Sequence, residues 1–280
     1  SDARNSRTVS REFGTDRGPI LLAGGTTIAS TQKSDDGQGS QNYQRVYANG
    51  PLYAPVTGYF SPAFASMTGL EREENSVLNG DDPSLFSSRI KTLVTGGSQK
   101  GGAVELTINP EIQQAAYGAI GNHKGAVVVL EPDTGKILAM VSKPDFDPNK
   151  LEKNWDKLST DKDQAALVNR ANQGLYPPGS TFKIVTSLAY LRQNNGSDHN
   201  FSYDCTGTFS KDGYTIHCFG NEKHGRENLT QAFGNSCNTA FSNVGLSLNY
   251  EQWKQTAGDM LFDTNLPTDL SNSAISKFQL

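Results

Sequence analysis

The chain has 280 residues, of which 35% are hydrophobic, so it can bury the core of one large domain or of two smaller ones. Its formal net charge of -4 and pI near 5.6 give no electrostatic basis for binding nucleic acid. No apolar run is long enough to span a bilayer, and the residues after Ser1 lack a signal-peptide pattern. These features predict a globular chain that does not recognise nucleic acid.

The first hundred residues differ in composition from the rest. Gly, Ser, Gln, Asn and Asp punctuate short hydrophobic patches there, and loops are predicted at residues 33–42 and 96–102. We therefore predict a separate, β-rich N-terminal module over residues 1–102, followed by a second domain over residues 103–280.

A helix and a hairpin are predicted next along the chain. Residues 110–120 have proline in the first turn and apolar residues at helical spacing. Residues 125–142 contain two runs rich in valine, isoleucine and leucine on either side of a Pro-Asp-Thr-Gly turn, which is typical of a strand, turn and strand. Because the helix can cover the sheet, the pattern predicts a mixed α/β (α+β) fold.

The stretch around Ser180 places a hydroxyl and an amine one helical turn apart. Two prolines and Gly179 interrupt the chain, and serine favours helix starts, so an apolar helix is predicted to begin at or beside Ser180. Residues three apart lie on one helix face, so the Lys183 amine can approach the Ser180 hydroxyl. The pair is a candidate nucleophile and base.

Lys183 can act as a base only if it loses its proton. A serine hydroxyl needs such a base, and a lysine with an ordinary pKa near ~10.4 is already protonated. Residues 182–191 are apolar around much of the helix, so we expect burial to lower the pKa of Lys183. The same Ser-x-x-Lys spacing at Ser30, Ser88 and Ser159 lacks the Pro-Gly stop and the apolar continuation, so spacing alone is not diagnostic.

A second polar element follows at Ser236 and Asn238, in a short turn between two helical patterns. A hydroxyl there can relay a proton between the nucleophile, the lysine and a leaving amine. The Asn238 amide offers a donor and an acceptor to a peptide bond. The alternative is a simple capping turn, as expected for the same spacing at Ser40 and Ser247.

The three cysteines suggest a disulfide rather than a metal site. Cys205 and Cys218 bracket a glycine-containing loop that a disulfide closes well outside the cytoplasm, although other pairings are open. Cys237 is expected to be a small buried thiol. A metal site would use His217, His224, Cys205 and Cys218, but no pair has a recognised zinc spacing. We therefore predict no metal and no cofactor, and expect all four histidines to be solvent exposed.

In this order and context, the motifs resemble those of the penicillin-binding, D-Ala-D-Ala-recognising acyltransferases. Residues 177–183 resemble the family's nucleophile motif, and residues 236–238 resemble its second motif. Residues 125–149 are similar to the start of its transpeptidase domain. Residues 17–20 and 52–61 resemble the extended, non-catalytic N-terminal module of class B penicillin-binding proteins, most closely the actinobacterial penicillin-binding protein A group.

The resemblance implies a penicillin-binding transpeptidase fold of the serine β-lactamase type and acyl transfer on a peptidoglycan stem peptide ending in D-Ala-D-Ala. Ser180 would attack the penultimate D-Ala carbonyl while Lys183 takes its proton, and the Ser180 backbone N–H would contribute to the oxyanion hole. Ser236 would pass the proton to the leaving amine, and Asn238 would hold the donor peptide amide. β-Lactams would acylate Ser180 as substrate mimics.

The family's third motif, Lys followed by Thr or Ser and then Gly, occurs nowhere in this sequence. In the family it supplies an oxyanion-hole N–H and recognises the substrate carboxylate. We therefore expect the transpeptidase domain to be incomplete at Leu280 and residues 1–280 alone not to turn over. The resemblance also implies a membrane anchor before Ser1, action at the extracytoplasmic face of the bacterial membrane, and cell-wall synthesis partners.

Two alternatives share part of this evidence. A serine β-lactamase or penicillin-sensing domain has the first two motifs, but the long N-terminal module argues against a compact β-lactamase. A non-catalytic scaffold protein of the cell-wall machinery would explain the missing third motif.

Overall fold

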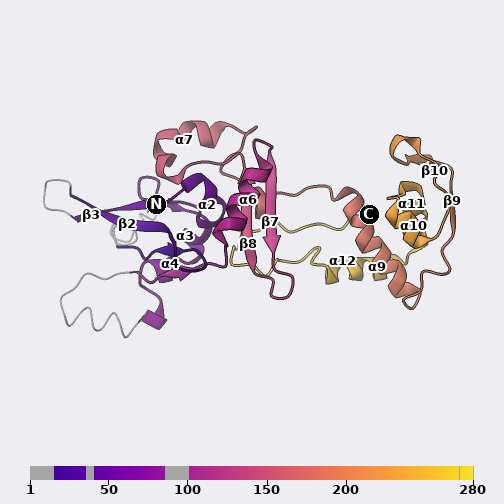
Figure 1. Cartoon of the computed structure of the whole chain (residues 1–280), viewed down its shortest axis with the longest axis horizontal. Coiled ribbons are helices and arrows are strands. Elements are labelled where there is room, and N and C mark those ends of the chain that lie inside the picture. The colour runs from indigo at the N-terminus through magenta and orange to yellow at the C-terminus, as the bar shows by residue number, and fades with distance from the viewer. Residues whose placement is uncertain (1–15, 36–40, 86–100, 271, 280) are drawn as a thin grey trace, which may run out of the picture. The chain divides into compact units, whose positions relative to one another are not determined.

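The structure is a computed structural model that describes residues 16–35, 41–85, 101–270 and 272–279. The chain divides into two compact units (Figure 1). Unit 1 comprises Ser1–Gly174 with Thr268–Ser273, and unit 2 comprises Leu175–Pro267 with Ala274–Leu280.

Unit 1 begins with a four-stranded sheet in the order β3-β2-β1-β6, in which only β1 and β6 run parallel. The strands are β1 (Ile20–Leu21), β2 (Thr27–Asp35), β3 (Gln41–Tyr47) and β6 (Val104–Glu105). The loop predicted at residues 33–42 is wrong at both ends, because ladder pairing of β2 with β3 extends to Asp35 and Gln41; residues 36–40 lie outside the described residues. Of the second predicted loop, residues 101–102 are described and are irregular.

The prediction of a β-rich N-terminal module is only partly correct. Besides the short strands β4 (Phe60–Ser61) and β5 (Ser66–Met67), the region contains the helices α2 (Gly50–Thr57), α3 (Gly69–Glu73) and α4 (Asn75–Leu78), and the 3-10 turn η1 (Pro83–Leu85). Proline in the first turn fits the start of α2, and nearly the whole helix is buried. Burial of its apolar residues therefore outweighs the turn signals that surround it.

A buried ion network joins the sheet to α3. The fully buried Glu71 carboxylate accepts hydrogen bonds from Arg17 Nε at 3.0 Å, from Arg45 Nε at 2.6 Å and from the Tyr47 hydroxyl at 3.1 Å. The Arg17 guanidinium also lies over the Phe60 ring, 4.2 Å from its centroid. One carboxylate thus holds two buried guanidinium groups.

The predicted helix and hairpin are confirmed as α6 (Pro110–Ile120), β7 (Gly125–Leu130) and β8 (Ile137–Lys143), and α6 lies across the hairpin (Figure 1). Ala116 packs with Ala139 and Val141 between them. The buried Gln113 amide donates to the carbonyls of Leu52 and Met140, at 2.8 and 2.9 Å, and accepts from the Met140 N–H. It therefore joins α6 to both α2 and β8.

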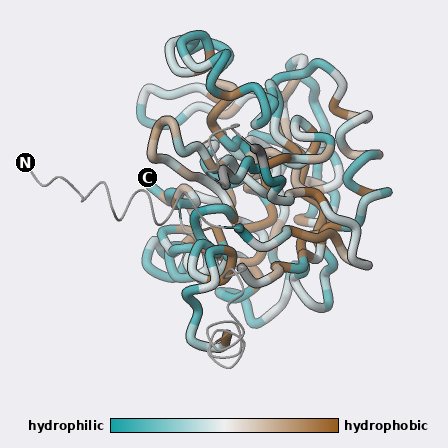
Figure 2. Tube along the Cα trace, turned by 90° about the vertical axis from the view of Figure 1, so that its left-hand side faces the viewer, coloured by the Kyte–Doolittle hydropathy of each residue, from teal (hydrophilic) through white to brown (hydrophobic). Residues whose placement is uncertain are grey.

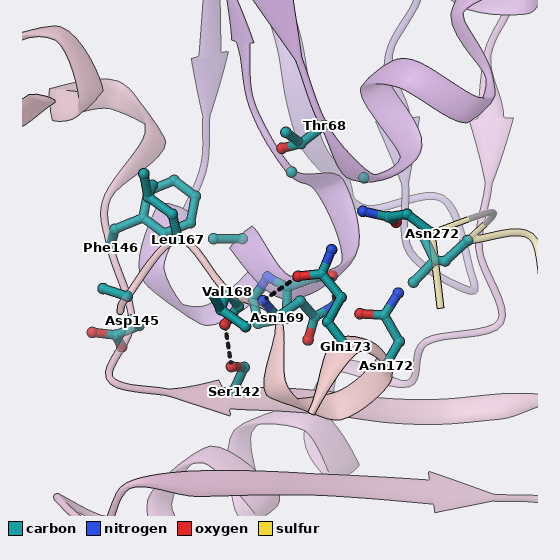
Figure 3. Close-up of a pocket in the computed structure, with 16 residues that line it drawn as sticks. Thr68, Ser142, Asp145, Phe146, Leu167, Val168, Asn169, Asn172, Gln173 and Asn272 are labelled. Carbon is teal, nitrogen blue, oxygen red and sulfur yellow. Dashed lines mark hydrogen bonds between the residues drawn. The ribbon is translucent and has the colours of Figure 1, made fainter. Parts of the chain in front are cut away.

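The last elements of unit 1 are η2 (Pro148–Lys150), α7 (Leu151–Thr160) and α8 (Arg170–Gln173). Beside α8 lies a cavity of about 60 Å³ (Figure 3). Two hydrogen bonds join groups of its lining: Ser142 Oγ donates to the Val168 carbonyl, and Gln173 Oε1 accepts from the Asn169 N–H. A ligand pocket usually measures roughly 300–1,000 Å³, so this cavity has room for a few waters only.

Unit 2 is built from short helices and two-stranded ribbons. Its helical elements are η3 (Gly179–Phe182), α9 (Lys183–Gln193), η4 (Phe219–Asn221), α10 (Leu229–Gly234), α11 (Asn238–Ser247) and α12 (Tyr250–Asp259). Strands β9 (Tyr203–Cys205) and β12 (Gly225–Glu227) pair with each other, as do β10 (Thr208–Lys211) and β11 (Tyr214–His217). Helices α9 and α12 lie side by side (Figure 1).

Hydrophilic and hydrophobic segments alternate along the chain (Figure 2). Within the described ranges, every helix is too short or too polar to cross a membrane.

We predict that Glu71→Gln strongly destabilises the protein. The substitution keeps the size of the side chain but leaves Arg17 and Arg45 without a counterion, at side-chain exposures of 1% and 3%. Removing one partner of a buried ion pair costs about 3–5 kcal/mol. Urea unfolding measures the effect. Asp163→Asn is the matched control, because it breaks an exposed pair with Lys124. Equal effects of the two substitutions would contradict a special role for the Glu71 network.

Candidate active site

The Ser180–Lys183 segment begins unit 2's main helix, as predicted. A 3-10 turn starts at Gly179 and passes into α9 at Lys183. The Ser180 hydroxyl does not cap the helix; instead Thr181 Oγ1 donates to the Pro178 carbonyl at 2.6 Å. Ser180 is therefore free to present its hydroxyl at the surface, where it is exposed, while Lys183 is only 9% exposed.

Phe182 anchors this turn from the side. Its ring stacks on Phe278 with 5.9 Å between centroids and meets Phe262 edge-on at 5.6 Å. Trp253 of α12 lies in the same cluster. Because Phe182 stands between the hydroxyl and the amine in sequence, its packing fixes the direction of both. Burial of α9 is less complete than predicted, since Ile184 remains 51% exposed.

The second element is a turn between α10 and α11, also as predicted. Asn228 and Gln231 form a capping box that starts α10. Ser236 has a left-handed backbone (φ 52°), which turns the chain sharply. Cys237 is fully buried and its Sγ accepts from the Ala240 N–H, capping α11. The turn thus pushes Ser236 outward while Cys237 points into the unit.

The structure brings the four predicted site residues together. Lys183 Nζ lies 3.1 Å from Ser180 Oγ, 3.0 Å from Ser236 Oγ, 2.7 Å from the Ser236 carbonyl and 2.7 Å from Asn238 Oδ1. The two hydroxyls lie 3.0 Å from each other. A proton can therefore move among Ser180, Lys183 and Ser236 without any large movement of a side chain.

The contacts of Lys183 can accommodate both a neutral amine and an ammonium. Its two shortest contacts are to the Ser236 carbonyl and Asn238 Oδ1, which can only accept. A neutral amine has two N–H groups for these acceptors and one lone pair left for a hydroxyl, and an ammonium can donate to both acceptors and to one hydroxyl. The remaining neighbours, at 3.0 and 3.1 Å, are the hydroxyls of Ser236 and Ser180, which accept from an ammonium; when the amine is neutral, one of them can donate to its lone pair.

Burial favours the neutral form of this amine. Desolvation by burial lowers the pKa of Lys183 from its ordinary value of 10.5, while negative charge at Cys237 and Cys218 opposes this shift. Burial is the larger of these effects, so the neutral form is more populated than in an exposed lysine.

Asn238 is held in one orientation from its other end. Its Nδ2 donates to the His217 carbonyl at the end of β11, at 3.0 Å, which directs Oδ1 toward Lys183. Lys183 and Asn238 line one edge of an open depression of about 520 Å³, whose apolar walls include Phe241, Trp253 and Phe278. The depression is large enough to hold a peptide-sized group.

The other Ser-x-x-Lys spacings form no such site. Ser30 lies in strand β2, Ser159 bonds its own helix through the Asp156 carbonyl, and Ser88 lies outside the described residues.

The predictions about cysteine and histidine need correction. Cys205 and Cys218 are not bridged: their Sγ atoms lie 3.7 Å apart as free thiols. Cys237 is buried, as predicted. His224 is not exposed as predicted, because only 13% of its side chain is accessible and its Nδ1 lies 3.4 Å from Cys205 Sγ.

Comparison with known proteins decides the family. Residues 125–279 match the penicillin binding protein transpeptidase domain. The chain belongs to this family. Residues 17–104 match the penicillin binding protein A dimerisation domain, and the predicted transpeptidase fold is confirmed.

Relatives of known sequence and solved structures support the same family. The peptidoglycan D,D-transpeptidase PbpA of Mycolicibacterium smegmatis is 41% identical over 283 residues, which cover 95% of this chain and 56% of that protein. PbpA of Mycobacterium tuberculosis is 41% identical over 264 residues, covering 88% and 52%. The imipenem acyl-enzyme of M. tuberculosis penicillin-binding protein A matches with a TM-score of 0.86 at 37% identity, over 95% of this chain and 63% of that chain. The chain spans about half the length of the curated relatives it matches.

A pH dependence follows from the position of Lys183. If the neutral amine is the base, the rate of acylation by a fluorescent penicillin rises with pH and levels off below the ordinary lysine pKa, since burial lowers the pKa of Lys183. Lys183→Arg should lose acylation at every pH, because a guanidinium stays charged. The control is Lys211→Arg, which alters an exposed lysine of unit 2 and should leave the profile unchanged. A profile that rises only at the pKa of an exposed lysine would contradict the assignment.

Proposed function

We propose that the protein containing this chain is a peptidoglycan D,D-transpeptidase that works through an acyl-enzyme on Ser180. The observation that carries the proposal is the convergence of an exposed hydroxyl, a buried amine and a second hydroxyl within 3.1 Å of one another. A serine becomes a nucleophile when a base with a lowered pKa adjoins it, and Lys183 meets that condition.

The chemistry takes two steps. In the first, Ser180 Oγ attacks the carbonyl carbon of the penultimate D-Ala while its proton passes to the Lys183 lone pair. The tetrahedral intermediate then collapses, the C–N bond to the terminal D-Ala breaks, and the leaving nitrogen takes a proton through Ser236. In the second step, an amine of a neighbouring stem peptide attacks the carbonyl carbon of the ester and loses a proton through Ser236. The C–O bond to Ser180 then breaks, and Ser180 Oγ takes its proton back from Lys183.

Binding groups are assigned in the same way. The Ser180 backbone N–H, in the first turn of a helical segment, contributes to the oxyanion hole, because N–H groups of a first turn have no carbonyl partner within the helix. Asn238 holds the donor peptide amide with its fixed side chain. β-Lactams acylate Ser180 because their ring amide mimics the D-Ala-D-Ala bond; the related penicillin-binding protein A of M. tuberculosis forms such an acyl-enzyme with imipenem.

The setting follows from the substrate. Peptidoglycan lies outside the cytoplasmic membrane, so the proposed site of action is its extracytoplasmic face, with anchoring through a segment that precedes Ser1. Residues 1–102 form the proposed non-catalytic module and residues 103–280 carry the transpeptidase part. The match of residues 17–104 to a dimerisation domain supports this division. The proposal includes assembly with cell-wall synthesis partners.

Intact mass spectrometry with penicillin tests the proposal. The natural full-length protein that contains this chain should gain one penicilloyl adduct that persists, and Ser180→Ala should gain none. Ser159→Ala is the matched control, because it removes a serine with the same spacing to a lysine but outside the site. An adduct that survives Ser180→Ala would refute the nucleophile. Rapid release of penicilloate would indicate a β-lactamase, and no adduct on the unaltered protein would indicate a non-catalytic scaffold.

A further inference from the structure

Four potential metal ligands converge directly beneath the Ser236 turn. Cys205, Cys218, His224 and Cys237 each present one donor atom, and all four atoms lie within 4.8 Å of one another. The residues come from separate places in the chain: the end of β9, the loop after β11, the loop before β12, and the start of α11, elements that gather in one part of unit 2 (Figure 1).

The distances fit a tetrahedral metal better than a disulfide. Sγ of Cys218 lies 3.7 Å from Sγ of Cys205 and 3.7 Å from Sγ of Cys237, and Cys205 Sγ lies 3.4 Å from His224 Nδ1. Zinc–sulfur bonds of about 2.3 Å at tetrahedral angles separate two sulfurs by about 3.8 Å. A disulfide would need about 2.05 Å and would leave the third thiol and the imidazole unexplained.

The donor atoms are shielded from water. Cys205, Cys218 and Cys237 are 1%, 4% and 0% exposed, and His224 keeps 13% of its side chain accessible. Three thiols and an imidazole are a common ligand set for structural zinc, whose sites are closed and four-coordinate. Nothing else in unit 2 has this composition among the residues that the structure describes.

Polar side chains surround the four potential ligands in the way that hydrogen-bonding groups surround metal-bound cysteine and histidine. Thr239 Oγ1 donates to Cys205 Sγ at 3.2 Å and lies 3.5 Å from Cys218 Sγ and 3.4 Å from Cys237 Sγ. The second ring nitrogen of His224 lies 3.5 Å from a Glu222 carboxylate oxygen, the carboxylate–histidine arrangement that orients a ligand.

A buried acid, Glu227, lies near the cluster. Glu227 is 1% exposed, its Oε1 accepts from Asn235 Nδ2 at 2.7 Å, and its Oε2 has no hydrogen-bond partner. Its charge acts on His224. Neither Arg nor Lys forms an ion pair with Glu227 within the described part of the chain.

We propose that Cys205, Cys218, His224 and Cys237 bind one Zn²⁺ ion as a structural site. The site would tie β9 and β12 to the turn that carries the candidate active-site groups, because Cys237 lies between Ser236 and Asn238 in sequence. The metal therefore holds Ser236 and Asn238 at Lys183 without touching the substrate. This positioning role rests on the proposed function, whereas the metal site itself does not.

The sequence prediction of no metal is thereby revised. The set considered from the sequence contains His217, His224, Cys205 and Cys218, and it omits Cys237, which is expected there to be a small buried thiol. In the structure His217 Nδ1 faces Thr208 Oγ1 at 3.3 Å, and the converging thiol is that of Cys237. The spacing of these residues in the sequence matches no common zinc motif, because strands β9, β11 and β12 and the start of α11 bring them together in space.

The test is the metal content of the natural full-length protein, purified without a histidine tag and with its thiols protected. Inductively coupled plasma mass spectrometry should find one zinc ion per protein chain. Replacement by Co²⁺ should give thiolate-to-metal charge-transfer bands and the intense d–d bands of a tetrahedral sulfur-nitrogen site. Cys205→Ser and His224→Ala should lose the metal, and His217→Ala, the matched control, should keep it.

Two results would overturn the proposal: zinc-free protein in which peptide mapping finds a disulfide among the three cysteines, or Co²⁺ spectra without thiolate bands. Both measurements use the unaltered protein, so neither result can be caused by a variant that fails to fold. Removal of zinc with a chelator should slow penicillin acylation by roughly 10- to 100-fold, and added Zn²⁺ should restore it. Zinc-loaded protein that is never acylated would refute the proposed function and leave the metal site standing; acylation by metal-free protein at the full rate would refute the positioning role.

Discussion

The candidate site depends on one buried amine. Lys183 is the only one of its four polar members that is buried, and its nitrogen contacts each of the other three. Removing an amine from water favours its neutral form, and the surrounding oxygens can exchange protons with it in that form. The other three polar residues of the site all converge on this nitrogen.

Two independent supports keep the amine and its partners in place. On one side, the aromatic cluster around Phe182 fixes the turn that carries Ser180 and begins α9. On the other, the buried Cys237 fixes the turn that carries Ser236, whose left-handed backbone is unfavourable for a residue with a side chain. Packing in unit 2 therefore offsets the local strain that the polar groups require, as is common at functional sites.

Local patterns predicted the elements that carry their own signals. The α6 helix, the β7–β8 hairpin and the start of α9 all follow from turn residues and hydrophobic periodicity over a few residues, although Ser180 does not cap α9 as its residue type suggested. Local patterns could not identify Ser236 and Asn238 as site residues. Ser247 and Asn249 have the same spacing, yet Asn249 caps α12 by accepting from the Gln252 N–H. Only the tertiary contact with Lys183 separates the two cases.

Features that depend on distant residues were not predictable in this way. The helices of the N-terminal region form because burial of apolar side chains outweighs turn propensity, and no short window records that balance. The burial of His224 and its approach to three thiols likewise arise from pairing of β9 with β12, which the sequence around His224 does not signal.

The most direct test of this account is an NMR titration of the Lys183 side-chain nitrogen in the unacylated protein, with the signal assigned by its loss in Lys183→Arg. The account predicts that Lys183 titrates below the ordinary lysine pKa of 10.5, because desolvation lowers it. Titration at or above that ordinary value would mean that the amine is not a base, and would contradict the central claim.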